Sequence, residues 1–180
     1  LFCTLLSVSV FILFSFLSPA YAQDITTGLV GHWKLDETTG TDAIDSAGSN
    51  DGAMNGGLDA GTDSVAGRVG TALSFDGTDD MIGIPDDATM NPTDWTIAAW
   101  FYINAVDGQP SQNIFGKASN TSNEDYAMDF NQPEETFRCG FEELGTDVNV
   151  ETPTSIATGV WHHGVCTYNS ATNEVIGYLD

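Results

Sequence analysis

Short runs of β-branched and aromatic residues recur along the chain, and clusters of Gly, Asn, Asp and Ser separate them. Apolar positions with helical spacing are nearly missing, and short apolar runs that alternate with turn residues are typical of an antiparallel sandwich or barrel. Dipeptides that favour tight turns, such as Asp76-Gly77 and Asp107-Gly108, lie between the runs. The pattern predicts strands at 29–35, 72–75, 81–84, 95–103, 113–117, 126–130, 136–141, 160–168 and 174–179.

Two stretches refine this prediction. The run at 95–103 is apolar at both odd and even positions, so we expect a strand that is buried on both faces and lies centrally between layers. The stretch 38–69 is rich in small polar residues, and we expect it to form a long surface loop with one short strand. No internal repeat and no linker divides the chain, which favours one domain.

The first residues have the features of an export signal. Residues 1–17 carry no charge, and Ala20-Tyr21-Ala22 follows them as an A-x-A cleavage site. We interpret 1–22 as a signal peptide that is incomplete at its start, because no basic segment precedes the apolar run. A membrane anchor is the alternative, although the run is slightly short for a span of ~20 residues. The domain would then occupy 23–180, and its last strands would be missing after 174–179.

The composition excludes some classes of partner. The chain has 26 acidic and four basic residues, which give a formal net charge of -22. A protein that grips nucleic acid or an anionic lipid surface needs clustered Lys or Arg, so neither partner is expected. The hydrophobic content of 41% is too high for a disordered acidic tail. The acidic excess favours solubility and also supplies oxygen ligands suited to Ca²⁺.

No catalytic motif is recognisable in the sequence. The G-x-S-x-G, H-E-x-x-H and P-loop patterns are absent, and so is the E-x-D-x-x-E spacing that would place two carboxylates on one face of a strand. The pairs Glu134-Glu135 and Glu142-Glu143 are adjacent, so their side chains diverge on an extended backbone. We therefore predict no catalytic residue and no enzyme activity for this chain.

Two kinds of residue could stabilise the fold or bind a ligand. Cys139 and Cys166 are the cysteines that remain after signal cleavage, and an even number in an exported domain suggests a disulfide. Two buried free thiols are the alternative. The acidic loops 76–80 and 120–125 could hold a hard cation such as Ca²⁺, but Asx turns without any metal would explain the same residues.

Six segments in order resemble the laminin-G-like, concanavalin A-like jelly-roll domains. The segment 28–37 resembles their opening strand, and 161–168 is similar to their W-H-H-V-A-x-T-Y strand. The run 95–100 resembles their F-T-I-S-A-W strand. The other segments that carry the likeness are 45–52, 70–85 and 177–180. The likeness covers essentially all of 28–180.

The resemblance implies an all-β fold, a two-sheet antiparallel jelly-roll sandwich, in a secreted or cell-surface protein. It implies that the strands with Cys139 and Cys166 are adjacent, which favours the disulfide. It also implies a calcium site at the rim of the sandwich. The residues that could bind calcium are Asp76, Asp79 and Asp80 first, and Glu124 and Asp125 second.

The function predicted from these observations is a secreted, non-catalytic module of a larger extracellular protein. It would bind a polysaccharide, a surface glycan or a matrix protein, with calcium as a candidate cofactor. We expect exposed ligand-binding residues in loops, and the candidates are Tyr126, Asn131 and Gln132. The alternatives are a glycoside hydrolase or polysaccharide lyase of the same fold, and an adhesion spacer with protein partners. No membrane contact is expected after signal cleavage.

Overall fold

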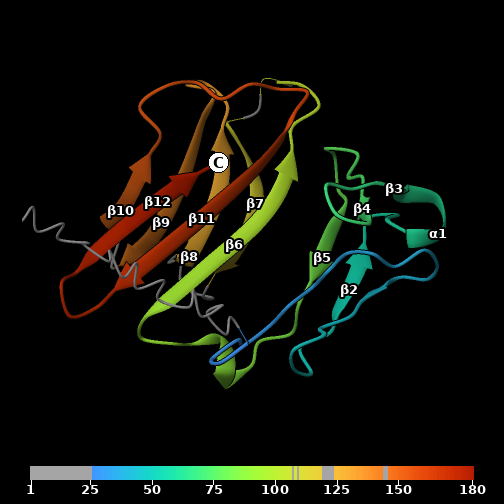
Figure 1. Ribbon diagram of the computed structural model, residues 1–180, viewed down its shortest axis with the longest axis horizontal. Coiled ribbons are helices and arrows are strands. Elements are labelled where there is room, and N and C mark those ends of the chain that lie inside the picture. Colours follow the sequence, from blue (N-terminus) through green and yellow to red (C-terminus); the bar gives the residue numbers. More distant parts are fainter. Residues whose placement is uncertain (1–25, 107, 109, 119–123, 144–145) are drawn as a thin grey trace, which may run out of the picture.

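The protein consists almost entirely of antiparallel strands (Figure 1). The computed structural model describes residues 26–106, 108, 110–118, 124–143 and 146–180. The signal-peptide prediction therefore lies outside the described residues. The two short helices of the described part fall well below the length and hydrophobicity that a membrane-spanning helix requires. The predicted all-β, antiparallel fold class is confirmed.

Two sheets form the main body of the protein, which lies on the left of Figure 1. The larger sheet has the order β10-β9-β8-β7 and the smaller has the order β12-β11-β6. The strands of the larger sheet are β7 (Ser111–Ala118), β8 (Glu124–Asn131), β9 (Thr136–Glu143) and β10 (Thr146–Glu151). Those of the smaller sheet are β6 (Trp95–Tyr102), β11 (Trp161–Asn169) and β12 (Glu174–Leu179).

The main core lies between these two sheets. Because successive side chains of a strand point to opposite faces, every second residue of β9 turns inward, starting with Phe137. Phe137 stacks against Phe101 of the other sheet with 5.9 Å between ring centroids. The fully buried side chains of this core also include Met128, Phe130, Cys139 and Cys166. Removal of these side chains from water drives the sheets together.

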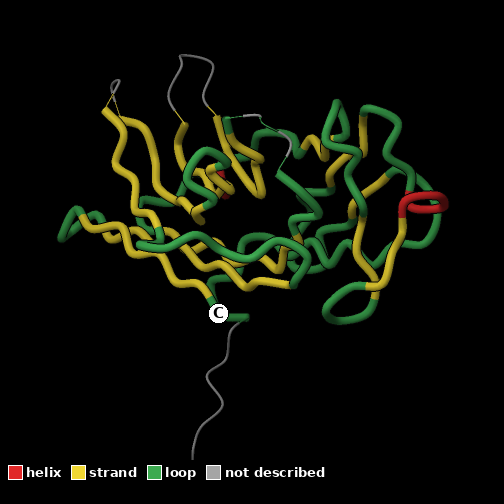
Figure 2. The backbone as a smooth tube through the Cα atoms, turned by 90° about the horizontal axis from the view of Figure 1, so that it is seen from above, coloured by secondary structure: helices red, strands yellow, loops and turns green. Residues whose placement is uncertain are grey.

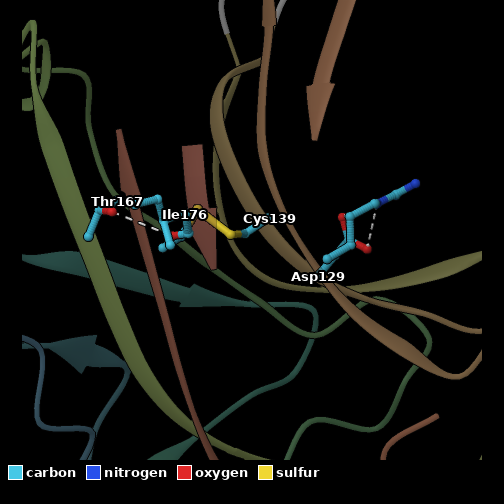
Figure 3. Close-up of a disulfide and its surroundings, with 6 residues drawn as sticks. Asp129, Cys139, Thr167 and Ile176 are labelled. Carbon is cyan, nitrogen blue, oxygen red and sulfur yellow. Dashed lines mark hydrogen bonds and ion pairs between the residues drawn. A yellow bond between two sulfur atoms is a disulfide. The ribbon is translucent and has the colours of Figure 1, made fainter. Parts of the chain in front are cut away.

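A disulfide joins the two sheets across this core (Figure 3). Cys139 belongs to β9 and Cys166 to β11, and their Cα atoms are 6.0 Å apart. The disulfide prediction is confirmed, but the expectation that the two strands are adjacent is wrong, because they belong to facing sheets. Gly177 of β12 allows the close approach, since a Cβ there would lie 3.3 Å from Cys139 Sγ.

A smaller region at the N-terminal side packs beside the sandwich, on the right in Figures 1 and 2. It has its own core, which includes Ala43, Leu58 and Leu73. Trp33 connects the two cores, because its ring lies 6.0 Å from that of Phe115. The region contains β1 (Asp42–Ala43), β2 (Gly52–Asn55), α1 (Ala60–Asp63), β3 (Ser64–Ala66), β4 (Thr71–Leu73), β5 (Met81–Gly83) and the 3₁₀ turn η1 (Ala88–Met90).

This region corrects two predictions. The stretch 38–69 is not a surface loop with one strand, because β1, β2, α1 and β3 lie in it and bury Ala43 and Leu58. The strand predicted at 29–35 is also wrong, since only Trp33 forms an isolated bridge there, with Asp45. The buried carboxylate of Asp45 takes the place of a partner strand and accepts a hydrogen bond from the His32 backbone N–H at 2.9 Å.

Two further differences concern the sandwich. β10 is absent from the predicted strands, although valines alternate with polar residues along it. β6 was expected to be buried on both faces and to lie between layers. Instead it is the last strand of its sheet in the order β12-β11-β6, and Trp100 and Tyr102 on one of its faces are 46% and 41% exposed.

Candidate functional site

The outward face of the smaller sheet carries a group of aromatic rings. They come from alternate positions of three neighbouring strands, while the residues between them fill the core. Tyr178 is the most exposed of them, at 54%. The rings that define this surface, here called the aromatic face, belong to Trp100, Tyr102, Trp161, His163 and Tyr178.

Strand pairing brings these rings together in rows. Trp100 lies opposite His163 across β6 and β11, and Tyr102 lies opposite Trp161. The ring centroids of the two pairs are 4.8 Å and 5.6 Å apart. Cross-strand aromatic pairs of this kind stabilise one another and hold each ring in a fixed orientation. The sheet therefore presents a rigid set of rings.

The aromatic face carries little charge. Among the outward positions of β6, β11 and β12, all of which the structure describes, the one carboxylate is that of Glu174, at the first position of β12. Arg68, from the turn between β3 and β4, brings a positive charge to the face, with its guanidinium carbon 5.3 Å from the centre of the Trp100 ring. This cation–π contact brings the smaller region against the face.

The outward face of the larger sheet is polar instead. Register places Asp129, Arg138 and Glu151 side by side on β8, β9 and β10. Arg138 donates hydrogen bonds from Nε and Nη2 to the Asp129 carboxylate at 3.1 to 3.2 Å. The side chains that define this polar face are Asn113, Asp129, Asn131, Thr136, Arg138, Asn149 and Glu151. In Figure 3, Asp129 lies on one side of the disulfide, and Thr167 and Ile176 of the opposite sheet lie on the other.

Burial has the largest influence on the pKa of Asp129, the acid at the centre of the polar face. The Asp129 side chain is 7% exposed. Burial raises the pKa of Asp129 above its usual value, and Arg138 counteracts only part of that effect. Glu151 accepts hydrogen bonds from Asn131 and Thr136 at 3.2 and 3.3 Å. With both Asp129 oxygens held by Arg138, this row acts as a structural ion-pair network.

The residues predicted to meet a ligand are placed differently from the expectation. Tyr126 is 6% exposed, stacks on Phe115 and donates a hydrogen bond from its hydroxyl to the Met90 carbonyl at 3.1 Å. Gln132 is 3% exposed, and its side-chain oxygen accepts a hydrogen bond from the Gly108 N–H at 3.0 Å. Their expected exposure is wrong, because Tyr126 points into the core. Asn131 alone is partly exposed, on the polar face.

The first set of predicted calcium ligands comes together in space. Asp76, Asp79 and Asp80 each offer a carboxylate oxygen, and these oxygens all lie within 4.8 Å of one another. They belong to the loop between β4 and β5, where Asp76 accepts a hydrogen bond from the Thr78 N–H at 2.8 Å. That bond, above all, lowers the pKa of Asp76, so the group stays ionised to acid pH. The arrangement could hold a hard cation.

The position of the second set of predicted calcium ligands is not described. Glu124 and Asp125 begin β8, but their side chains lie outside the described residues.

A shallow, open cavity elsewhere is lined by residues 28–30 and 47–50 together with Asp87 and Thr89. The Asp87 carboxylate already accepts hydrogen bonds from Thr89. This cavity therefore presents backbone and small side chains rather than groups suited to chemistry.

Residues 76–180 match the laminin G-type profile of the concanavalin A-like lectin/glucanases superfamily. The chain belongs to this superfamily. No curated protein and no solved structure gives a significant match to it. The match covers both sheets of the sandwich and the β5 strand before them. The fold alone admits both binding proteins and enzymes, so function has to be argued from the surfaces.

The sequence alone did not single out the aromatic face. Trp100 and Tyr102 lie in the run that is predicted to be buried on both sides, and Tyr178 is not among the predicted ligand-binding residues. A signal was present, since each of β6, β11 and β12 carries at least one ring at an outward position, but it could be read only with the register of the three strands.

Proposed function

We propose that this chain is an exported, non-catalytic module that binds carbohydrate through the aromatic face. The observation that carries the proposal is the set of exposed rings on β6 and β12, with the half-buried rings of β11 between them, which the fold does not need for its core. Sugar rings present C–H faces that pack against aromatic rings, and their hydroxyls need a few polar groups nearby. A rigid aromatic sheet surface supplies the first of these requirements.

Several features support this assignment. Large exposed apolar groups that lie together are unusual on a soluble domain and mark binding surfaces. His163, Arg68 and the Tyr178 hydroxyl supply polar groups beside the rings. The superfamily is described by its lectins and glucanases, both of which recognise sugars. The disulfide between the sheets favours an oxidising compartment and therefore export.

The non-catalytic part of the proposal rests on the placement of acids. Hydrolysis of a glycoside usually needs two carboxyl groups on either side of the bond. The outward positions of β6, β11 and β12 offer Glu174 alone. Asp180, directly after β12, has its carboxylate on His162 Nδ1 and on the His163 backbone N–H at 2.7 and 2.9 Å, which leaves it poorly placed to face a second carboxyl group across a sugar. The buried acid of the polar face, Asp129, is held by Arg138 at both oxygens and so is poorly placed to exchange a proton with a substrate.

Calcium is proposed as the ion held by Asp76, Asp79 and Asp80. Three carboxylates in one short loop provide the hard oxygen ligands that Ca²⁺ prefers. Because this loop belongs to the smaller region and not to the aromatic face, the ion would order the β4–β5 connection rather than contact the sugar. Calcium would thus stabilise the fold of the smaller region.

The test compares polysaccharide binding by the chain with that by Trp100→Ala, measured by affinity electrophoresis and titration calorimetry. Phe75→Ala is the matched control, because Phe75 is 43% exposed and lies outside the aromatic face. We expect Trp100→Ala to weaken binding about tenfold or more and the control to change it little. Binding to extracellular proteins but to no polysaccharide would favour the adhesion alternative, and turnover of a polysaccharide would favour the enzyme.

A further inference from the structure

We propose that the aromatic face selects uncharged polysaccharides and rejects uronate-containing or sulfated ones. The inference rests on the proposed function and adds the chemical class of ligand. It comes from where the charges of the chain lie. The net charge of -22 creates a negative field around the whole domain, and a polyanion approaching any surface of it is repelled.

The basic residues cannot offset this repulsion at the aromatic face. Lys117 forms an ion pair with Asp86 at 3.2 Å. Arg138 is bound to Asp129 on the opposite side of the sandwich. Lys34 belongs to the smaller region. Of the four bases of the chain, Arg68 is the one that contacts a ring of the aromatic face.

Arg68 is arranged to bind hydroxyls rather than a row of anions. A single guanidinium can compensate one negative group, whereas an acidic polysaccharide carries such groups repeatedly along its length. The Arg68 guanidinium already lies over the ring of Trp100, which belongs to the edge strand β6. There it can donate hydrogen bonds to sugar hydroxyls at the end of a row of rings.

The low density of charge on the face itself agrees with this. Its outward positions carry Trp, Tyr, His, Val, Ile, Ala, Thr and Asn, with Glu174 as the one carboxylate within the three strands. The Asp180 carboxylate, directly after β12, accepts a hydrogen bond from the His163 backbone N–H and adds to the repulsion of anions. A neutral sugar chain can cover such a surface without desolvating an ion, which would be costly. A charged chain would leave its own anions without partners, so the face favours the neutral class.

The experiment measures affinity for neutral and acidic probes in EDTA, so that calcium cannot bridge carboxylates. The neutral probes are hydroxyethyl cellulose, a mannan and a xylan without uronate, and the acidic probes are polygalacturonate and heparin. At low salt we expect the acidic probes to bind at least about tenfold more weakly than the best neutral probe. Raising the salt to about 0.5 M should narrow the gap, because screening removes repulsion, while neutral binding changes less than about twofold.

Variants separate this inference from the proposed function. Trp100→Ala should weaken neutral binding about tenfold or more. Arg68→Gln should weaken it about threefold, because Gln replaces the guanidinium donors beside Trp100 with a single amide. Preference for an acidic probe at low salt, lost in both Trp100→Ala and Arg68→Gln, would overturn the inference and leave the proposed function intact. Binding of no probe, or self-association of the chain through Trp100, would overturn both.

Discussion

The outward side chains of the two sheets differ in kind, although both sheets follow the same alternation of inward and outward residues. The smaller sheet turns rings such as Trp100 and Tyr178 outward. The larger sheet turns amides and an ion pair outward, with Asp129 and Arg138 at its centre. The inward faces, in contrast, are both mainly apolar around the disulfide, although the smaller sheet also turns His162 inward.

This difference shows which residues the fold requires and which it leaves open. Inward positions must be apolar and fit one another, so their composition reports on packing. Outward positions are not bound by that requirement, and polar side chains are the usual choice there. Exposed aromatic rings on one outward face alone therefore indicate a role outside the fold, and the predictions below test whether the two faces divide stability and binding between them.

The largest effect is expected for the core that both faces share. The Cys139→Ala/Cys166→Ala double variant removes a cross-link over 27 residues of sequence, and loss of the chain-entropy contribution should lower the free energy of unfolding by about 3 to 4 kcal/mol. Urea denaturation of the variant and of the reduced wild type measures it. A decrease below about 1 kcal/mol would show that the sheets do not depend on the disulfide.

On the polar face, Arg138→Met should lower stability without changing glycan binding. It leaves the Asp129 carboxylate buried without its guanidinium partner, and we expect a loss of about 2 kcal/mol, since Arg138 is itself 31% exposed. Asn149→Ala, at an exposed position of the same face, serves as the control with a change within about 0.5 kcal/mol. Weakened glycan binding in Arg138→Met, measured under folding conditions, would contradict the division between the faces.

On the aromatic face the expected pattern is reversed. Tyr178→Thr removes the most exposed ring but keeps a residue suited to a strand, so the free energy of unfolding should change by less than about 0.5 kcal/mol. Affinity for a neutral polysaccharide should fall about threefold to tenfold. Thermal melts and titration calorimetry on the same sample give both numbers. Equal losses of stability and affinity would mean that the ring serves the fold.

A pH series sharpens the comparison further, because it reports on the polar face alone. The raised pKa of Asp129 means that the folded state holds its proton more readily than the unfolded chain does. Acidification from above this pKa toward the ordinary value of 3.8 should therefore stabilise the wild type relative to Asp129→Asn. Urea midpoints of both proteins at several pH values measure the difference. A gap that stays constant with pH would contradict the assignment.

The smallest effect is expected from calcium, whose proposed site lies on neither of the two faces. Calcium should raise the melting temperature by a few degrees at concentrations about tenfold above its dissociation constant, since an ion bound only to the folded state stabilises it. Asp79→Asn/Asp80→Asn should remove this shift, because two of the three clustered carboxylates are lost. Polysaccharide affinity should be the same in calcium and in EDTA. An affinity that needs calcium would place the ion at the sugar site instead.

The sequence predicted the sandwich better than it predicted the site. The strands from 72 to 179 were found nearly at their observed positions, apart from β10, because alternation and turn residues are local signals. The segment 29–35 failed because Asp45, far along the chain, binds its backbone in place of a strand. The predicted exposure of Tyr126 is wrong because its position beside a loop does not show that its side chain packs on Phe115.

By itself, the sequence determined that the chain forms antiparallel strands, that Cys139 and Cys166 pair, and that three aspartates come close in one loop. Each of these follows from alternation, from the number of cysteines or from neighbours in the chain. Only the tertiary structure decided that the disulfide joins facing sheets and that the second apolar side of β6 is exposed. An apolar residue looks the same in a sequence whether a second layer covers it or not, and only the packing of distant strands makes that distinction.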